Sequence, residues 1–181
     1  MTARPLLLLD VDGPLNPYAA QPERRPAGYT THRFTAPLGH GGARPLRVWL
    51  SPAHGPRLLG LPYELVWATT WMHGANTHIA PVLGLPELPV IEWPELFAVE
   101  PDGVHWKAPH ILRWAAGRAF AWVDDEITDA DERFFAAHHP GPALLHHVDP
   151  RRGLRDEDFA ALAAWADENG AGPEACPAPG P

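Results

Sequence analysis

The sequence predicts an α/β protein with a doubly wound, mostly parallel five-stranded sheet and a small β-hairpin inserted after the first strand. Three observations predict this fold class. Five short runs are apolar nearly throughout, which is typical of strands buried on both faces of a parallel sheet. Helical patterns lie between these runs, and such alternation gives a sheet covered on both faces. Residues 28–50 break the alternation.

The strand-like runs are each bounded by Pro, Gly or Asp, residues that end regular structure. They cover Pro5–Val11, Glu64–Thr69, Leu88–Glu92, Ala119–Val123 and Ala143–Val148. The segments between and after these runs have apolar residues at helical spacing. The expected helices are Ala53–Leu59, Asn76–Leu83, Pro109–Gly117, Asp129–His138 and Arg155–Asp167.

The interrupting segment, residues 28–50, has the pattern of a hairpin. Two strand-like runs, Tyr29–Thr35 and Leu46–Leu50, lie on either side of the turn-forming Gly39-His40-Gly41-Gly42. Strand runs separated by a glycine-rich turn favour antiparallel pairing. We therefore expect a β-hairpin that projects from the sheet near the end of the first strand.

The composition is that of an ordinary folded domain, with 45% apolar and 20% charged residues. We expect one domain over residues 1–167. Residues 168–181 are mostly small residues and proline, which cannot bury a core, and they predict a disordered tail. The single cysteine, Cys176, excludes an intrachain disulfide. With no apolar run of signal-peptide or membrane-spanning length, the expected location is the cytoplasm.

The charge of the chain and its missing motifs exclude several function classes. A formal net charge of −8 argues against a general affinity for nucleic acid, because no basic stripe is available to displace counterions. It is compatible with a phosphorylated substrate if a metal ion supplies positive charge locally. A P-loop protein would need Gly-Lys-Ser/Thr and a serine hydrolase would need Gly-x-Ser-x-Gly, and neither occurs.

Acidic and hydroxyl side chains stand where three predicted strands end. The first strand is followed by Asp10-Val11-Asp12-Gly13, the second by Thr69-Thr70, and the fourth by Asp124-Asp125. Ligands of open parallel sheets bind outside these carboxyl ends. Two like charges about 4 Å apart repel by roughly 4 kcal/mol at an effective dielectric of about 20. Clustered carboxylates therefore need a cation, and oxygen ligands around an open site favour Mg²⁺.

The only lysine of the chain also falls at this edge. The sequence has 13 arginines and a single lysine, Lys107, which stands just before the helix that leads into the fourth strand. A lysine is a compact point charge with three donors, and it can pair a carboxylate and a phosphoryl oxygen together. Because the helix dipole does not favour a cation at a helix start, its position indicates a functional role.

The order of these motifs resembles the haloacid dehalogenase (HAD) superfamily over about residues 5–167. Members of that superfamily have a strand followed by Asp-x-Asp-Gly, a strand followed by Thr or Ser, a Lys that opens a helix, and a strand followed by two acids. The corresponding segments here are Asp10-Val11-Asp12-Gly13, Thr69-Thr70-Trp71, Trp106-Lys107-Ala108-Pro109 and Asp124-Asp125. The resemblance implies a Rossmann-like core and a phosphatase-like member, since the dehalogenases lack the second aspartate.

The resemblance also implies catalytic roles. Asp10 would attack phosphorus and form an aspartyl-phosphate. Asp12 would protonate the leaving oxygen and then accept a proton from the hydrolytic water. Thr69 would hydrogen-bond the phosphoryl group, with Thr70 as the adjacent alternative. Lys107 would hold the nucleophile and neutralise developing charge.

A Mg²⁺ ion is implied by the same resemblance. Asp10, the main-chain carbonyl of Asp12, and Asp124 or Asp125 would hold it. Trp71 and Trp106 flank the expected crevice and could stack on a substrate base or ring. Asn16, in the loop after the nucleophile, could contact substrate or serve the turn.

The substrate stays open at this point. There are 56 positions between Asp12 and Thr69 and 37 between Thr69 and Lys107, and neither interval clearly holds a large cap domain. A minimal cap implies an open site, which is consistent with a bulky or macromolecular substrate. Thr69-Thr70-Trp71 is similar both to superfamily members of unknown substrate and to phosphatase domains associated with RNA repair. Net charge favours a small phosphorylated molecule, the open site permits a polynucleotide end, and a catalytically idle regulatory or binding member is a further alternative.

Overall fold

The computed structural model describes residues 4–34 and 45–169, and its centre is a four-stranded parallel sheet. The strands run in the order β4-β1-β5-β6. Their bounds are β1 Leu6–Leu9, β4 Glu64–Trp67, β5 Phe120–Asp124 and β6 Ala143–His147. This arrangement confirms the α/β fold class predicted from the alternation of apolar runs and helices.

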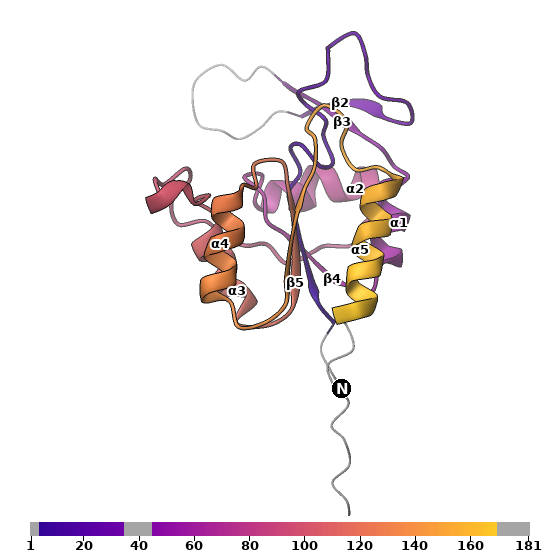
Figure 1. Ribbon diagram of the computed structural model, residues 1–181. Coiled ribbons are helices and arrows are strands. Elements are labelled where there is room, and N and C mark those ends of the chain that lie inside the picture. Colours follow the sequence, from indigo (N-terminus) through magenta and orange to yellow (C-terminus); the bar gives the residue numbers. More distant parts are fainter. Residues whose placement is uncertain (1–3, 35–44, 170–181) are drawn as a thin grey trace, which may run out of the picture.

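Helices cover both faces of this sheet (Figure 1). On β1, Leu7 and Leu9 point into one core, whereas Leu6 and Leu8 point into the other, as the two-residue period of a strand requires. The first core lies under α1 His54–Gly60, α2 Ala80–Leu83 and α5 Asp156–Asn169. The second lies under α3 Ala108–Ala115 and α4 Asp129–His138. All four leucines of β1 are buried, which explains the unbroken apolar run.

The third expected strand, Leu88–Glu92, contributes one bridge rather than a strand. Val90 lies beside Trp67 at the free edge of β4, where the Trp67 amide donates to the Pro89 carbonyl and the Ile91 amide donates to the Trp67 carbonyl. Prolines at 86, 89 and 94 lack amide hydrogens, and proline is confined to sheet edges. The sheet therefore has four strands with this segment along one edge.

The predicted hairpin is present as a separate antiparallel pair after β1. β2 Thr30–Phe34 pairs with β3 Leu46–Leu50, and Figure 1 shows the pair beyond the carboxyl ends of the parallel strands. The expected turn Gly39-His40-Gly41-Gly42 lies outside the described residues. Val48 and Leu50 are fully or almost fully buried, so the base of the hairpin is packed onto the domain.

Helix bounds agree with the sequence pattern to within a few residues. The 76–83 segment is a π-helical turn, η1 Ala75–Ile79, that continues into α2, and a short 3₁₀ turn, η2 Pro101–Gly103, precedes α3. α5 runs to Asn169, two residues into the predicted tail, and the rest of that tail lies outside the described residues. None of the described helices is long and apolar enough to span a membrane.

Candidate active site

Three carboxylates meet at the carboxyl ends of the neighbouring strands β1 and β5. Asp10 directly follows β1, Asp124 is the last residue of β5, and Asp125 comes next. One oxygen from each lies within 4.8 Å of the others. Asp124 is fully buried and Asp10 is 6% exposed. Adjacent pairing of β1 with β5 brings together acids that stand more than a hundred positions apart in the sequence.

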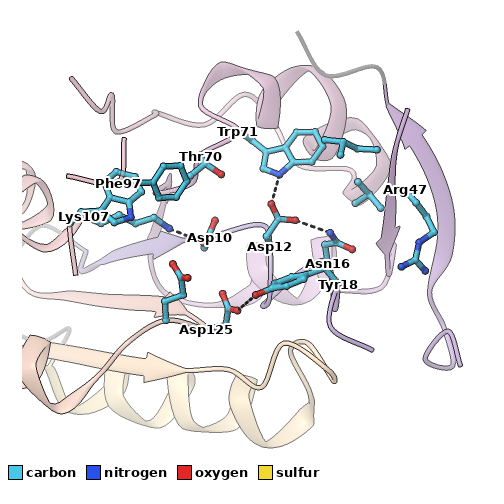
Figure 2. A pocket seen from close by; sticks show the side chains of 14 residues that line it. Asp10, Asp12, Asn16, Tyr18, Arg47, Thr70, Trp71, Phe97, Lys107 and Asp125 are labelled. Carbon is cyan, nitrogen blue, oxygen red and sulfur yellow. Dashed lines mark hydrogen bonds and ion pairs between the residues drawn. The ribbon is translucent and has the colours of Figure 1, made fainter. Parts of the chain in front are cut away.

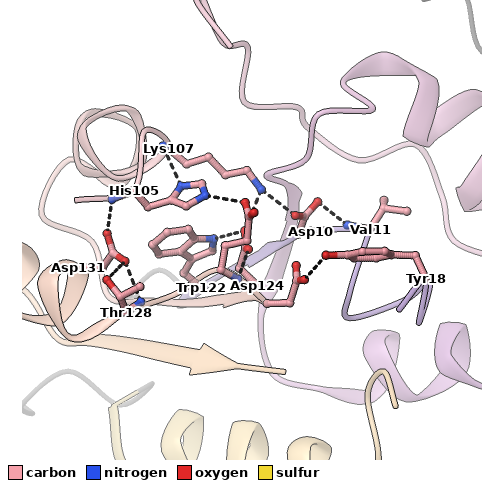
Figure 3. Close-up of polar contacts among 11 residues, drawn as sticks. Asp10, Val11, Tyr18, His105, Lys107, Trp122, Asp124, Thr128 and Asp131 are labelled. Carbon is pink, nitrogen blue, oxygen red and sulfur yellow. Dashed lines mark hydrogen bonds and ion pairs between the residues drawn. The ribbon is translucent and has the colours of Figure 1, made fainter. Parts of the chain in front are cut away.

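Lys107 joins two of these acids (Figure 3). Its Nζ donates to Asp10 Oδ2 at 2.7 Å and to Asp124 Oδ2 at 2.8 Å, and the side chain is 2% exposed. The second Asp10 oxygen accepts the Val11 amide at 2.7 Å. The single lysine therefore lies where the sequence pattern indicated, against the predicted nucleophile.

The buried charges do not balance within this group. Burial raises the pKa of Asp10 to about 7, which Lys107 opposes and Asp124 reinforces. Burial alone would lower the pKa of Lys107, but the two flanking carboxylates raise it above its ordinary value, so the ammonium stays charged. One ammonium thus faces three carboxylates. At the low effective dielectric of a buried site, this excess of negative charge favours an additional cation.

The main chain before α3 is held by a network that sets the position of Lys107. The His105 amide donates to Asp131 Oδ1 at 2.7 Å, and the Lys107 amide donates to His105 Nδ1 at 3.1 Å. Asp131 also accepts from Thr128 in a capping box at the start of α4. Because His105 Nδ1 accepts a hydrogen bond, its Nε2 carries the proton and donates to Glu126. These contacts, visible in Figure 3, assign Asp131 a structural role.

Asp12 lies in the same loop as Asp10, but it is held by a different set of neighbours. Asn16 Nδ2 donates to Asp12 Oδ1 at 2.7 Å, and Trp71 Nε1 donates to Asp12 Oδ2 at 2.8 Å. Asn16 Oδ1 in turn accepts the Trp49 amide of β3 at 3.0 Å. Asn16 and Trp71, predicted as substrate contacts, therefore use these polar atoms to orient the predicted general acid, and any contact with substrate stays a prediction.

The turn after Asp12 depends on a glycine. Gly13 has a φ of +89°, and a Cβ there would lie 2.6 Å or less from three side-chain atoms of Asp125. Only glycine allows both this conformation and this approach. Tyr18, further along the loop, donates from its hydroxyl to Asp125 Oδ2 at 2.9 Å. The loop after β1 is thus attached to the acidic pair that follows β5.

The two threonines after β4 face different surroundings. Thr69 is fully buried, and its hydroxyl lies close enough to Asp10 to lower the pKa of that carboxyl group. The Thr69 carbonyl accepts Trp93 Nε1 at 2.9 Å. Thr70 is partly exposed and lines the adjoining cavity. Both hydroxyls are therefore near the acids, one beside the predicted nucleophile and one towards solvent.

A cavity of about 360 Å³ opens beside these groups (Figure 2). It is lined by predicted site residues together with residues that the sequence patterns did not single out. The latter are Tyr18, Leu46, Arg47, Val48, Phe97 and Glu126. Phe97 is 68% exposed and has a φ of +59°, an uncommon conformation for a bulky side chain. No local sequence motif predicts these residues at the site. They reach it because the tertiary fold places the hairpin and the 94–100 loop next to the strand ends.

The acid group suits a hard divalent cation. All its donors are oxygens, it carries excess negative charge, and Asp125 opens onto the cavity. Mg²⁺ prefers such oxygen ligands and keeps positions for water and phosphate oxygens. Asp10, Asp124 and Asp125 are thus the carboxylates that would hold it, since one oxygen of each lies within 4.8 Å of the others, whereas the Asp12 carboxylate is not part of this group.

Comparison with known families gives a direct result. The model of the HAD domain in Swiss Army Knife RNA repair proteins matches residues 6–159. The chain belongs to this family. It is therefore a HAD superfamily member, as the four sequence motifs indicated. Searches of curated proteins and of solved structures found no match. The matched residues of this HAD domain include the hairpin, both strand-end acid groups and Lys107.

Proposed function

We propose that the protein is a Mg²⁺-dependent phosphatase that forms an aspartyl-phosphate on Asp10 and acts on the phosphorylated end of a polynucleotide. The observation that carries the chemistry is the contact of Lys107 Nζ with both Asp10 and Asp124, beside Asp125. An amine shared by two buried carboxylates at strand ends suits transfer of a phosphoryl group to one of them.

In the proposed reaction, one carboxylate oxygen of Asp10 forms a bond to phosphorus as the bond to the leaving oxygen breaks. Asp12 gives a proton to that leaving oxygen, then accepts one from the water that hydrolyses the aspartyl-phosphate. Lys107 holds Asp10 in place and offsets charge that develops on the phosphoryl oxygens. Thr69, beside Asp10, donates to the phosphoryl group, and Thr70 faces the remainder of the substrate.

The cation would be held by Asp10, Asp124, Asp125 and the main-chain carbonyl of Asp12. When bound, it supplies positive charge to the phosphoryl oxygens and offsets the repulsion among the acids. The ligand assignment is supported by the oxygen-only donor set within 4.8 Å.

The proposed substrate class rests on the family together with the cavity. Net charge by itself favours a small phosphorylated molecule, but the matched family is that of RNA repair proteins, which favours a polynucleotide end. Phe97 lines the cavity as an exposed aromatic ring, and bases stack on such rings with little sequence preference. Trp71 lines the same cavity.

Hydrolysis assays test the proposal. The full chain with Mg²⁺ should release phosphate from p-nitrophenyl phosphate and from 3′- or 5′-phosphorylated oligonucleotides. We expect Asp10→Asn to lower kcat by about 10⁴-fold or more, because the covalent route is lost. Removal of Mg²⁺ with EDTA should abolish turnover, and added Mg²⁺ should restore it.

Three results would contradict the proposal in different ways. Metal-dependent turnover that survives Asp10→Asn would remove the nucleophile assignment. Turnover of phosphorylated metabolites but not of oligonucleotides would retain the chemistry and reject the substrate class. Absence of turnover on every substrate would favour the idle binding member of the fold.

A further inference from the structure

The positive charge of this acidic protein is concentrated in the segment that contains the hairpin. Residues 13–63 contain six arginines and a single carboxylate, Glu23, although the whole chain has a formal net charge of −8. β2 and β3 lie in this segment, and β3 contributes to the lining of the active-site cavity. The cluster of Asp10, Asp124 and Asp125 therefore lies beside an inserted segment that has a net positive charge.

Three of these arginines gather on one face of the hairpin. Arg33 and Arg47 are direct cross-strand partners, so their side chains leave the same face. Thr31 lies on that face, and its hydroxyl accepts Arg25 Nη1 at 3.2 Å. We call the face formed by Arg25, Thr31, Arg33, Arg47 and Trp49 the arginine face.

The charges of the arginine face are not neutralised by the described protein. Like charges directly opposite each other across two strands are destabilising, yet Arg33 and Arg47 form no ion pair within residues 4–34 and 45–169. The arginines that do form ion pairs in those ranges are Arg57, Arg118, Arg151, Arg152 and Arg155. Repulsion of this kind is relieved when an anion binds between the cations.

Arg47 is held in a fixed position rather than extended into solvent. Its guanidinium carbon lies 3.8 Å from the centroid of the Trp49 ring, and Trp49 Nε1 donates to Thr31 Oγ1 at 3.1 Å. Arg47 Nη1 is buried and has no hydrogen-bond partner among the described residues. A stacked, pre-positioned guanidinium with an unused donor suits phosphate binding.

The arginine face meets the active-site cavity at Arg47, although the neighbouring lining residues Leu46 and Val48 leave the other face of β3. Arg47 belongs to the cavity lining, and Figure 2 shows it at the hairpin end, across from Phe97 and Lys107. The Trp49 amide donates to Asn16, whose side chain donates to Asp12. The distance between the arginines and the predicted general acid is therefore set by two consecutive hydrogen bonds.

We infer that the arginine face binds the phosphodiester backbone of the polynucleotide whose phosphorylated end lies in the cavity. The inference rests on the proposed function and adds to it the surface that distinguishes a polynucleotide from a small phosphate ester. It also answers the objection from net charge, because the chain carries −8 overall whereas residues 13–63 carry six arginines and one carboxylate, and Arg33 and Arg47 are cross-strand partners there.

The test compares the double variant Arg33→Gln/Arg47→Gln with Arg133→Gln, which removes an exposed arginine from α4. The measured quantity is the ratio of kcat/KM for 3′- and 5′-phosphorylated strands of about 12 nucleotides to kcat/KM for p-nitrophenyl phosphate. The double variant should lower this ratio about ten-fold or more. The slope of log kcat/KM against log salt should fall in magnitude by about 1.4 for two lost phosphate contacts on a single strand. Arg133→Gln should leave the ratio and slope unchanged.

A binding measurement separates this inference from the catalytic proposal. Fluorescence anisotropy of labelled RNA and DNA strands that lack a terminal phosphate reports backbone binding without turnover. Weaker binding by the double variant but not by Asp10→Asn or Arg133→Gln would support the arginine face, even if no substrate were hydrolysed. Parallel RNA and DNA strands show which sugar the surface accepts.

Three outcomes would overturn the inference. The double variant could bind both strands as tightly as the unmodified protein. It could lose activity on p-nitrophenyl phosphate and on oligonucleotides by the same factor, which would mean that the arginines support the fold. Finally, the double variant could bind both strands more weakly while the salt dependence of binding stays unchanged, which would mean that the two arginines do not contact phosphates.

Discussion

The two sides of the active-site cavity are built on different physical principles. On the strand-end side, Asp10, Lys107 and Asp124 are almost fully buried and hold one another by short charged contacts. On the hairpin side, Arg47 is partly exposed, stacks on Trp49 and forms no ion pair with any described carboxylate. The strand-end side is a buried cluster of charges that pair with one another. The hairpin side instead presents cations suited to an anionic partner.

This difference separates chemistry from recognition. Buried charges must be paired closely, so the strand-end side tolerates little change. The hairpin side is joined to the catalytic loop through the Trp49–Asn16–Asp12 hydrogen bonds, yet its cations are still available. Changes on the two sides should therefore have different signatures, the first in folding and kcat, the second in substrate affinity.

The largest effect is expected from Lys107→Met. The substitution leaves Asp10 and Asp124 buried without their ammonium partner, which should lower the free energy of unfolding by about 3–5 kcal/mol and remove activity. Urea unfolding followed by circular dichroism measures the loss. Arg155→Met, which removes an exposed ion pair with Glu157, should cost less than about 1 kcal/mol. Equal losses of unfolding free energy in the two variants would mean that the buried contacts of Lys107 stabilise the fold no more than an exposed ion pair does.

The next effect concerns the base of the hairpin and its response to pH. His54, the first residue of α1, packs edge-on against Tyr29 and near Phe159. Burial, assisted by Arg57, lowers the pKa of His54 to about 4, so the folded state prefers the neutral ring. Its contribution is fully present above the unfolded pKa of 6.5 and is lost as pH falls from there towards 4.

Thermal or urea unfolding of the protein and of His54→Gln, at several pH values between 7 and 4, measures this contribution. The unmodified protein should lose up to about 3 kcal/mol more than His54→Gln over that interval. Parallel pH profiles for the two proteins would exclude His54 as the titrating group. Hydrogen exchange at the β2–β3 amides would show whether the loss begins at the hairpin.

The smallest of the three effects tests the orientation of Asp12. Trp71→Phe keeps an aromatic ring but removes the N–H that donates to Asp12 Oδ2. Loss of a hydrogen bond to a charged group should lower kcat about 10-fold, with little change in KM. Trp165→Phe on α5, where the ring stacks on Tyr63 far from the acids, is the matched control. A rise in KM with unchanged kcat would instead assign Trp71 to substrate binding.

The strand-end side could be predicted from sequence because its signals are local. A run of buried leucines followed by Asp10-Val11-Asp12-Gly13 indicates both the strand and the polar residues after it, and the same holds for Asp124-Asp125 after β5. Even Lys107 is conspicuous as the only lysine in the chain. The expected strand Leu88–Glu92 was the exception, since prolines reduce that segment to a single bridge between Val90 and Trp67.

The hairpin side could not be predicted to the same degree. Its two strands were expected, but the register that sets Arg33 opposite Arg47 depends on pairing across residues that share no motif. The Trp71–Asp12 contact joins the loop after β1 to the segment after β4, and Asn16 joins the same loop to β3 through the Trp49 amide. Neither residue type indicates such a partner in the sequence. The exposed Phe97 lies in a loop without regular structure.

The sequence by itself determined the α/β architecture, the acids at the strand ends and the family, because period, burial and short motifs act within a few residues of one another. Tertiary structure alone decided that one ammonium is shared by Asp10 and Asp124, that Asp12 is held by Asn16 and Trp71, and that the arginines of an acidic chain gather on the hairpin. Apart from the Asn16–Asp12 bond, those contacts join residues distant in the chain, and their energies depend on burial and register, which exist only after the sheet and the hairpin have formed.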